Sequence, residues 1–287
     1  MKKNFKTMAV VGIVVGCVTV VSVGVLAHAN GNAYQDFRNA ALHTMRERNM
    51  TISSDITVLQ NGEVLVTSET LLQRDGRNQY SSSLTQVNGE TLEKERASSE
   101  AGRITRVGDE FTSVSFEGRR SRERQRENHN PSPSEVRLTE MFADILVGDI
   151  RTHFTRSGDT ISVNLEGAQI PEILNMAASA AMERSEARPD RAHHEGNHFG
   201  DVFKTMPINS DVQIRRIGVE TELNGRLLGD STFTLLVTGM DSDGNLQEIE
   251  MIFNASFSDI GGTTPNTIDT AGRIVTEVPL SDSRRRH

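Results

Sequence analysis

The sequence predicts an α+β protein in which a large antiparallel sheet packs on a few helices, preceded by an N-terminal transmembrane helix or signal segment. Three observations support this prediction. An uncharged apolar run fills residues 8–27, Thr-, Ser- and Val-rich stretches are divided by Asn-Gly and Asp-Gly pairs, and helical apolar periodicity is confined to short segments. Asn-Gly and Asp-Gly pairs are typical of the turns that join antiparallel strands.

The composition limits the possible functions. The chain has 287 residues with 31 Lys and Arg, 39 Asp and Glu, one Cys and a net charge of -8. An acidic net charge disfavours nucleic-acid binding, because neutralising many phosphates needs clustered cations, so we expect no nucleic-acid partner. One Cys excludes a disulfide framework and a multi-thiolate metal site. The sequence contains no P-loop, GxGxxG or GxSxG motif, so we predict a non-catalytic protein without a cofactor.

Residues 1–29 are expected to form a cytoplasmic tip and a membrane anchor or signal segment. Three lysines, at positions 2, 3 and 6, precede the uncharged run 8–27. As a helix this run would be about 30 Å long, which matches the hydrocarbon core of a bilayer. Because basic residues stay on the cytoplasmic side, we expect a single-pass cell-membrane protein whose bulk is extracytoplasmic.

Three fates of this segment remain open. In the first, residues 8–27 stay in the membrane as an uncleaved anchor. In the second, the small-x-small pattern at 27–29 directs cleavage after Ala29 and releases a secreted protein. In the third, the Val-Val-Gly-Cys at 14–17 resembles a bacterial lipobox, which would make Cys17 a lipidated N-terminus. Each of the three exports the chain.

Gly12 and Gly16 have the GxxxG spacing that lets two membrane helices approach closely. This spacing predicts weak dimerisation through the membrane segment. The alternative is that the two residues reflect only the high frequency of Gly in such helices.

An extracytoplasmic domain is expected over residues 30–280, ahead of a basic tail at 281–287. It opens with a helix over 33–47, whose apolar residues recur at spacings of three and four: Tyr34, Phe37, Ala41 and Met45. A meander of about six strands follows over 51–116, where apolar residues alternate with Thr, Ser and charge. Four dipeptides mark its turns: Asn61-Gly62, Asp75-Gly76, Asn88-Gly89 and Gly108-Asp109.

Helices and a short hairpin are expected in the middle of the chain. One helix is predicted over 134–146, and a second begins at Pro171, a residue favoured in the first turn of a helix. Between them, the segment 153–165 is predicted to be a strand pair. Two polar stretches, near 119–133 and 185–200, are expected to be flexible loops.

Long strands are predicted again in the last third of the chain. They lie at 212–223, 227–237 and 246–257 and are separated by Asn-Gly and Asp-Gly turns. The remaining residues are expected to add an edge strand and a tail.

The histidines of HHEGNH, His193, His194 and His198, are the one tight cluster of metal-ligating residues in the sequence. A helix would place His194 and His198 one turn apart, a spacing suited to Zn²⁺ or Ni²⁺. Pro189 and Gly196 disfavour a helix here, so a polar surface loop is the preferred interpretation and no metal site is predicted. An exported metal-binding protein or metal-dependent hydrolase remains the alternative function.

Four segments carry a resemblance to a known family: AYQDFRNAALHTMRERNMTISSDITV, RVGDEFTSV, QIPEILNMAASAAM and FSDIGGTTPNT. Their layout resembles the LolA/LppX-like lipoprotein-carrier superfamily of exported half-barrels, over residues 33–278. The resemblance implies a large curved antiparallel sheet that wraps a few helices and can shelter a lipid or another apolar ligand.

We therefore expect a membrane-anchored, extracytoplasmic binding or interaction domain that is not an enzyme. Its partner would be an apolar ligand or another protein of the cell envelope. The concave sheet and the two mid-chain helices would form the ligand cleft, with these lining residues: Leu138, Phe142, Ile145, Ile173, Leu174 and Ala177.

Overall fold

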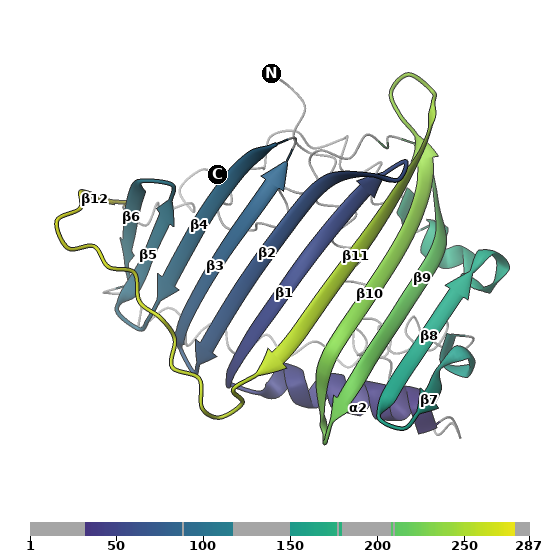
Figure 1. The fold of residues 1–287 in the computed structure, drawn as a ribbon, viewed down its shortest axis with the longest axis horizontal. Coiled ribbons are helices and arrows are strands. Elements are labelled where there is room, and N and C mark those ends of the chain that lie inside the picture. The colour runs from purple at the N-terminus through teal and green to yellow at the C-terminus, as the bar shows by residue number, and fades with distance from the viewer. Residues whose placement is uncertain are drawn as a thin grey trace, which may run out of the picture.

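The computed structural model describes residues 32–87, 89–116, 150–176, 178–179, 208 and 210–278. These residues form one twelve-stranded sheet in the order β12-β6-β5-β4-β3-β2-β1-β11-β10-β9-β8-β7 (Figure 1). Neighbouring strands are antiparallel throughout, except that β12 runs parallel to β6. The sheet is open, because β12 and β7 lie at its two edges and do not pair with each other.

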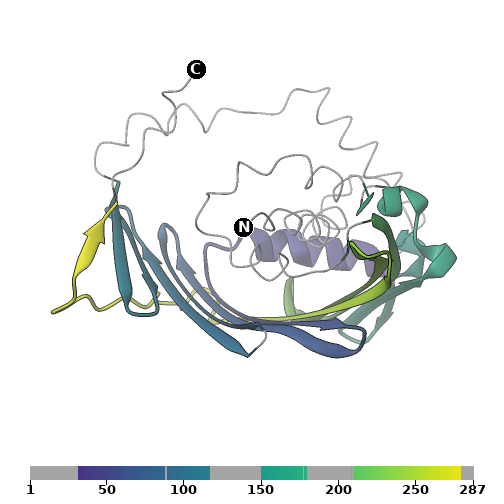
Figure 2. The same ribbon diagram turned by 90° about the horizontal axis from the view of Figure 1, so that it is seen from above.

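The sheet curves into a trough, and a helix lies inside the trough over the half that carries β9, β10 and β11 (Figure 2). This helix, α2 (Asn32–Arg46), ends with His43 and Arg46 in its last turn, where positive charge interacts favourably with the helix dipole. The face that holds α2 is the concave face of the sheet, and the opposite one is the convex face.

The first six strands form a meander of consecutive hairpins. Asn61 and Gly62 have φ values of 50° and 86°, and two positive values in succession are what a tight hairpin turn of two residues requires. The next turn lies at Gly76-Arg77, one residue later than the sequence predicted. The strands are β1 (Asn49–Gln60), β2 (Glu63–Asp75), β3 (Asn78–Val87), β4 (Glu90–Ser98), β5 (Gly102–Val107) and β6 (Glu110–Ser115).

The middle of the chain adds a short hairpin at the far edge of the sheet. It consists of β7 (Thr155–Ser157) and β8 (Thr160–Glu166), flanked by the 3-10 turns η3 (Arg151–His153) and η4 (Gly167–Gln169). Residues 172–176 are helical, directly after Pro171, as predicted. The predicted helix over 134–146, both predicted loops, residues 1–29 and the tail at 281–287 lie outside the described residues.

Three long strands complete the sheet: β9 (Ser210–Asn224), β10 (Leu227–Met240) and β11 (Leu246–Ser258). The last of them pairs with the first strand of the chain over ten residue pairs, from Thr51↔Ser258 to Gln60↔Ile249. This pairing joins the two ends of the described chain into one sheet. The short β12 (Val275–Glu277) then adds to β6 at the opposite edge.

The main core lies between α2 and the concave face. Phe37, which is 1% exposed, packs against Phe154 with ring centroids 5.4 Å apart, and Tyr34 contacts the same ring edge-on at 5.2 Å. Strand residues that alternate along β1, β8, β10 and β11 supply the other side, among them Ile56, Val58, Ile161, Val163, Leu235, Val237, Ile249 and Met251. The small Ala40 and Ala41 let the helix lie close to the sheet.

A buried hydroxyl fixes the position of the helix on the sheet. Thr44 Oγ1 donates to Ala40 O at 2.9 Å and accepts from the backbone N–H of Leu228 at 2.9 Å. Nη2 of Arg74 donates to Thr44 O at 3.2 Å. The last turns of α2 are therefore bonded to β2 and to the start of β10.

A second, smaller core lies on the convex face, under the segment that leads from β11 to β12. Tyr80, Phe111 and Ile268 are its buried members. The segment is held at its start by Thr263, whose N–H donates to Asn49 Oδ1 at 2.7 Å while its hydroxyl bonds that of Thr51 at 3.0 Å. It crosses the ends of β3, β4 and β5 in Figure 1.

The predicted fold class is confirmed at the level of an α+β protein with a large, open antiparallel sheet and few helices. The apolar residues of the meander lie on two different faces of the sheet. Tyr80 and Leu84 lie on the convex face, because Leu84 is in register with Glu69 and Asp55, whereas Ile56 and Val66 face α2. Among the described helices none is long and apolar enough to cross a membrane.

The packing of α2 predicts a large effect of Phe37→Ala. Truncating a fully buried Phe leaves a cavity and costs about 3–5 kcal/mol, so the free energy of unfolding of the full-length protein should fall by this amount in urea titrations. Met45→Ala is the matched control, because Met45 is on the same helix but 57% exposed. It should change the free energy by less than about 0.5 kcal/mol; equal losses in the two variants would contradict this packing.

Candidate functional site

The concave face has two halves of different chemistry. The half under α2 is apolar and filled by the helix side chains described above. The other half, formed by β3–β6, has no described helix over it (Figure 2). We call this second half the polar wall, and define it by the residues that the strand register places on the concave side: Ser81, Ser83, Thr85, Lys94, Arg96, Ser98, Arg103, Thr105 and Thr112.

The period of two along each strand creates the polar wall. In β4, with the sequence ETLEKERAS, Lys94 and Arg96 point to the concave side, and Glu93 and Glu95 to the convex side. Because successive side chains alternate, the run from Glu93 to Arg96 sends its two carboxylates to one face and its two cations to the other. The wall therefore carries three cations, Lys94, Arg96 and Arg103, and the register places Glu90 and Glu110 on the same side at the first residues of β4 and β6.

Two arginines of the polar wall lie next to each other, and no described residue forms an ion pair with either of them. Arg96 is directly opposite Thr105, and Arg103 is opposite Ser98, so the two arginines are diagonal neighbours on β4 and β5. The Nε atoms of both are buried and have no hydrogen-bond partner. Burial lowers the pKa of the Arg96 guanidinium from its ordinary value, and the charge of Arg103 lowers it further.

The acidic residue closest to Arg103 along the chain does not neutralise it. Glu100 lies in the turn between β4 and β5, and its Oε1 accepts from Nη1 of Arg77 at 3.1 Å. Within the part of the chain that the structure describes, neither Arg96 nor Arg103 has an ion pair.

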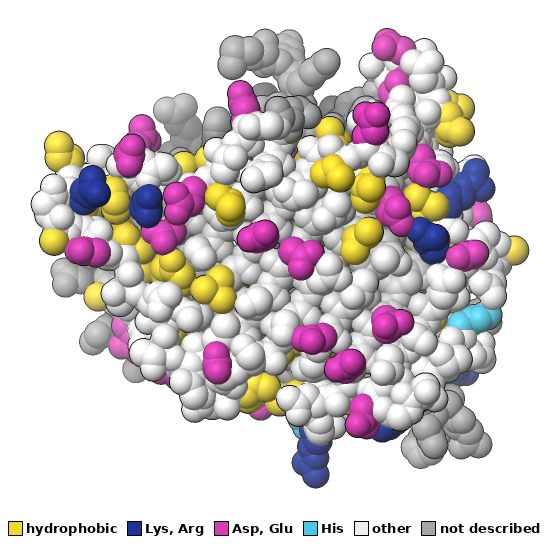
Figure 3. Space-filling model, in the orientation of Figure 1, with side chains coloured by type: hydrophobic (Ala, Val, Ile, Leu, Met, Phe, Trp, Pro, Cys, Tyr) yellow, Lys and Arg dark blue, Asp and Glu magenta, His cyan; other side chains and the backbone are white. Residues whose placement is uncertain are grey.

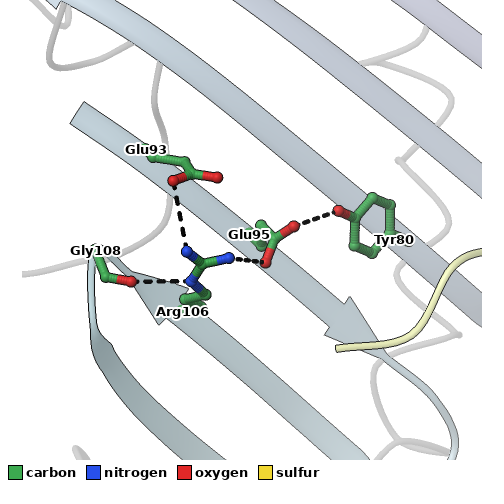
Figure 4. A network of polar contacts seen from close by, with 5 residues as sticks. All are labelled: Tyr80, Glu93, Glu95, Arg106 and Gly108. Carbon is green, nitrogen blue, oxygen red and sulfur yellow. Dashed lines mark hydrogen bonds and ion pairs between the residues drawn. The ribbon is translucent and has the colours of Figure 1, made fainter. Parts of the chain in front are cut away.

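On the convex face of the same strands, an arginine is fully paired (Figure 4). Nη1 of Arg106 lies 3.1 Å from Glu95, its Nη2 lies 3.5 Å from Glu93, and its Nε donates to Gly108 O at 2.9 Å. The hydroxyl of Tyr80 donates to the other oxygen of Glu95 at 2.7 Å. This network links β3, β4 and β5, and it shows how the fold neutralises an arginine where the role is structural.

Carboxylates are spread over the convex face, and few cations accompany them (Figure 3). A shallow groove of about 1010 Å³ crosses it, lined by Ser and Thr side chains and by Asp55, Glu69, Glu93 and Asp230. Asn254 donates to Asp55 and accepts from Thr232, both at 2.8 Å, so part of this row is bonded internally. No group of three His, Cys, Asp or Glu among the described residues is arranged to hold a metal ion.

The described part of the predicted ligand cleft belongs to the core. Leu174 is 8% exposed and is a member of the main core, and Ile173 beside it is half-buried. Asn175 Oδ1 accepts from the N–H of Ile214 at 2.8 Å, which bonds this helical segment to β9. The other predicted cleft residues, Leu138, Phe142, Ile145 and Ala177, lie outside the described residues, as do His193, His194 and His198.

The polar wall is not among the features that the sequence predicted. The alternating charges of ETLEKERAS were a usable indication, because they predict a strand with opposite charge on its two faces. What the sequence did not contain is which face lies inside the trough. That depends on the pairing of β1 with β11 and on the side that α2 covers.

The chain has no match among family models, and no curated protein matches it. A solved structure described as a thioesterase II from Thermobifida fusca aligns at 9% identity, with 82% of this chain and 89% of that chain covered and a TM-score of 0.12. A TM-score this low carries no inference about fold or activity, so the function has to be inferred from the residues of this chain itself.

The convex network predicts a high pKa for Tyr80. Burial raises the pKa of this phenol above its ordinary value of 10, and the hydrogen bond to Glu95 and its charge raise it further. The chain has two tyrosines, so in a Tyr34→Phe variant the near-ultraviolet absorbance of the phenolate reports Tyr80 alone. We expect a titration midpoint above pH 10.

The associated stabilisation has a definite sign. Because the pKa is raised by folding, the contribution is fully present below pH 10 and is lost as the pH rises through the raised pKa. Adding Glu95→Gln to the Tyr34→Phe variant should move the midpoint back towards 10. A midpoint at or below 10 in the presence of Glu95 would show that the network does not form.

Proposed function

We propose that this chain is a membrane-anchored, extracytoplasmic and non-catalytic binding domain, related to the lipoprotein-carrier half-barrels, which shelters a lipid or another apolar ligand in the trough of its sheet. The anchor is the apolar run at residues 8–27. The observation that carries the proposal is the open, curved sheet whose concave face α2 fills on one half only (Figure 2).

The chemistry of the half that α2 does not cover supports a ligand with both apolar and polar parts. Leu92 and Val107 are 44% and 37% exposed, and the register places them on the concave side, next to Lys94. Exposed apolar side chains grouped beside a polar wall are typical of a ligand-binding surface. An amphiphile would place its chain along these residues and its polar end on the hydroxyls and cations of the wall.

The hydroxyls of the sheet take part in the hydrogen bonding of the fold, which fits a binding role. The described histidines, His43 and His153, lie in α2 and η3. Several hydroxyls of the sheet bond one another, as in Ser68 with Thr85 at 2.8 Å and Thr221 with Ser231 at 2.6 Å, and Thr232 donates to the amide of Asn254 at 2.8 Å. None of these hydroxyls has a histidine, lysine or carboxylate as its hydrogen-bond partner, as the nucleophile of a catalytic site would.

The chain contains no tryptophan, so a single introduced tryptophan can report the ligand. We expect the emission of Thr105→Trp, on the concave side of β5, to be quenched saturably by a brominated long-chain alcohol added to full-length protein. Thr67→Trp, on the convex side of β2, is the matched control, because Thr67 is in register with Thr57 on that face. Its emission should not change.

Two outcomes would count against this function. One is the absence of saturable quenching in Thr105→Trp. The other is equal quenching of both variants, which would indicate partition of the alcohol into detergent and not binding in the trough. Extraction of the purified full-length protein and mass spectrometry of the extract should detect a co-purifying apolar compound.

A further inference from the structure

Arg96 and Arg103 form an arrangement that the fold by itself does not explain. They are diagonal neighbours on adjacent antiparallel strands, a relation that places Cβ atoms about 7–8 Å apart. Both side chains are half-buried, and both Nε–H groups are shielded from water and unbonded. An unbonded buried donor costs free energy, and so does a like charge at this separation.

The same two strands show that a neutral arrangement was available. Arg106 lies on β5 three positions after Arg103 and points to the opposite, convex face. It has two carboxylate partners and a carbonyl partner (Figure 4). On the concave side, Arg96 faces hydroxyls instead, with Ser81 on β3 and Thr105 on β5 directly opposite. Hydroxyls can donate to an anion, but they cannot neutralise an arginine.

We propose that Arg96 and Arg103 are a binding site for a phosphate oxyanion in the trough. Guanidinium groups bind phosphate through paired N–H donors, and two of them match the charge of a phosphate dianion. The hydroxyls of Ser81, Ser98 and Thr105 surround the pair in the register. Ser83 Oγ, two positions along β3 from Ser81, is also buried without a partner.

This inference rests on the proposed function in one respect, namely that the concave face is the ligand-binding face. It adds the chemistry of the polar end of the ligand. The phosphate group can come from a phospholipid head group or from free phosphate, and both sources present the same oxygens to the two arginines.

Calorimetric titration of the full-length protein with inorganic phosphate tests the site directly. We expect saturable binding, weakened at least about tenfold by Arg96→Gln and by Arg103→Gln, because each removes a charge-assisted bidentate contact. Arg226→Gln is the control, since Arg226 is exposed in the turn between β9 and β10 and its loss changes the net charge equally. Equal weakening by Arg226→Gln would overturn the proposal, since it would indicate a general charge effect.

The stability of the variants separates a binding role from a structural one. In phosphate-free buffer, Arg96→Gln and Arg103→Gln should unfold at the same temperature as the wild type or higher, because each removes an uncompensated charge. Added phosphate should raise the unfolding temperature of the wild type and leave both variants unchanged. Lower stability of the variants together with unaltered phosphate binding would overturn the proposal.

Lipid titrations distinguish the two sources of the phosphate. Phosphatidylglycerol is compared with diacylglycerol of the same chains, which lacks the phosphate. Preference for phosphatidylglycerol that is lost in both variants assigns the site to a head group, and binding of inorganic phosphate alone assigns it to free phosphate. If neither phosphatidylglycerol nor inorganic phosphate binds, the phosphate site is refuted. The brominated alcohol has no charge and tests the apolar part of the trough separately.

Discussion

The pairing of β1 with β11 is the interaction on which the rest of the structure depends. It joins the six-stranded meander to the strands β7–β11 over ten residue pairs. It also sets the register of the whole sheet. Because side chains alternate between faces, a slip by one residue would turn every core residue of β1 towards solvent. The core under α2 requires Ile56 and Val58 on the same side as Ile249 and Met251, and this fixes one register.

That register also separates the charges of the molecule. Once Ile56 and Val66 face the helix, Glu93, Glu95 and Arg106 must face outward and Arg96 and Arg103 inward. The outward charges neutralise one another in a network that also includes Tyr80. The inward arginines remain without a counter-ion among the described residues. β4 and β5 therefore carry paired charges on their convex face and unpaired arginines on their concave face. Such a difference between faces is typical of proteins that keep a binding surface at some cost in stability.

The two halves of the trough differ in chemistry. In the half near β10, the side chains of α2 occupy the concave face, and Phe37 and Tyr34 contact Phe154. In the half near β4, hydroxyls, arginines and the exposed Leu92 and Val107 are at the surface. An amphiphile bound in the trough would lie beside α2, with its apolar part towards the helix and its polar part towards β4. The convex face has no comparable division, because its small core is covered by the segment around Thr263 and Ile268.

Local sequence patterns are enough to predict several elements: the helix with Tyr34 and Phe37 on one face, the six-stranded meander, the three long strands after it, and turns such as Asn61-Gly62. These features depend on neighbours within a few residues, through helical or strand periodicity and through turn backbone preferences. Only the tertiary structure decided that β1 pairs with β11, that Tyr80 and Leu84 face away from Ile56, and that Arg96 and Arg103 point into the trough. The physical reason is that the two faces of a strand are equivalent until another element covers one of them, and for β4 that element is far away in the sequence.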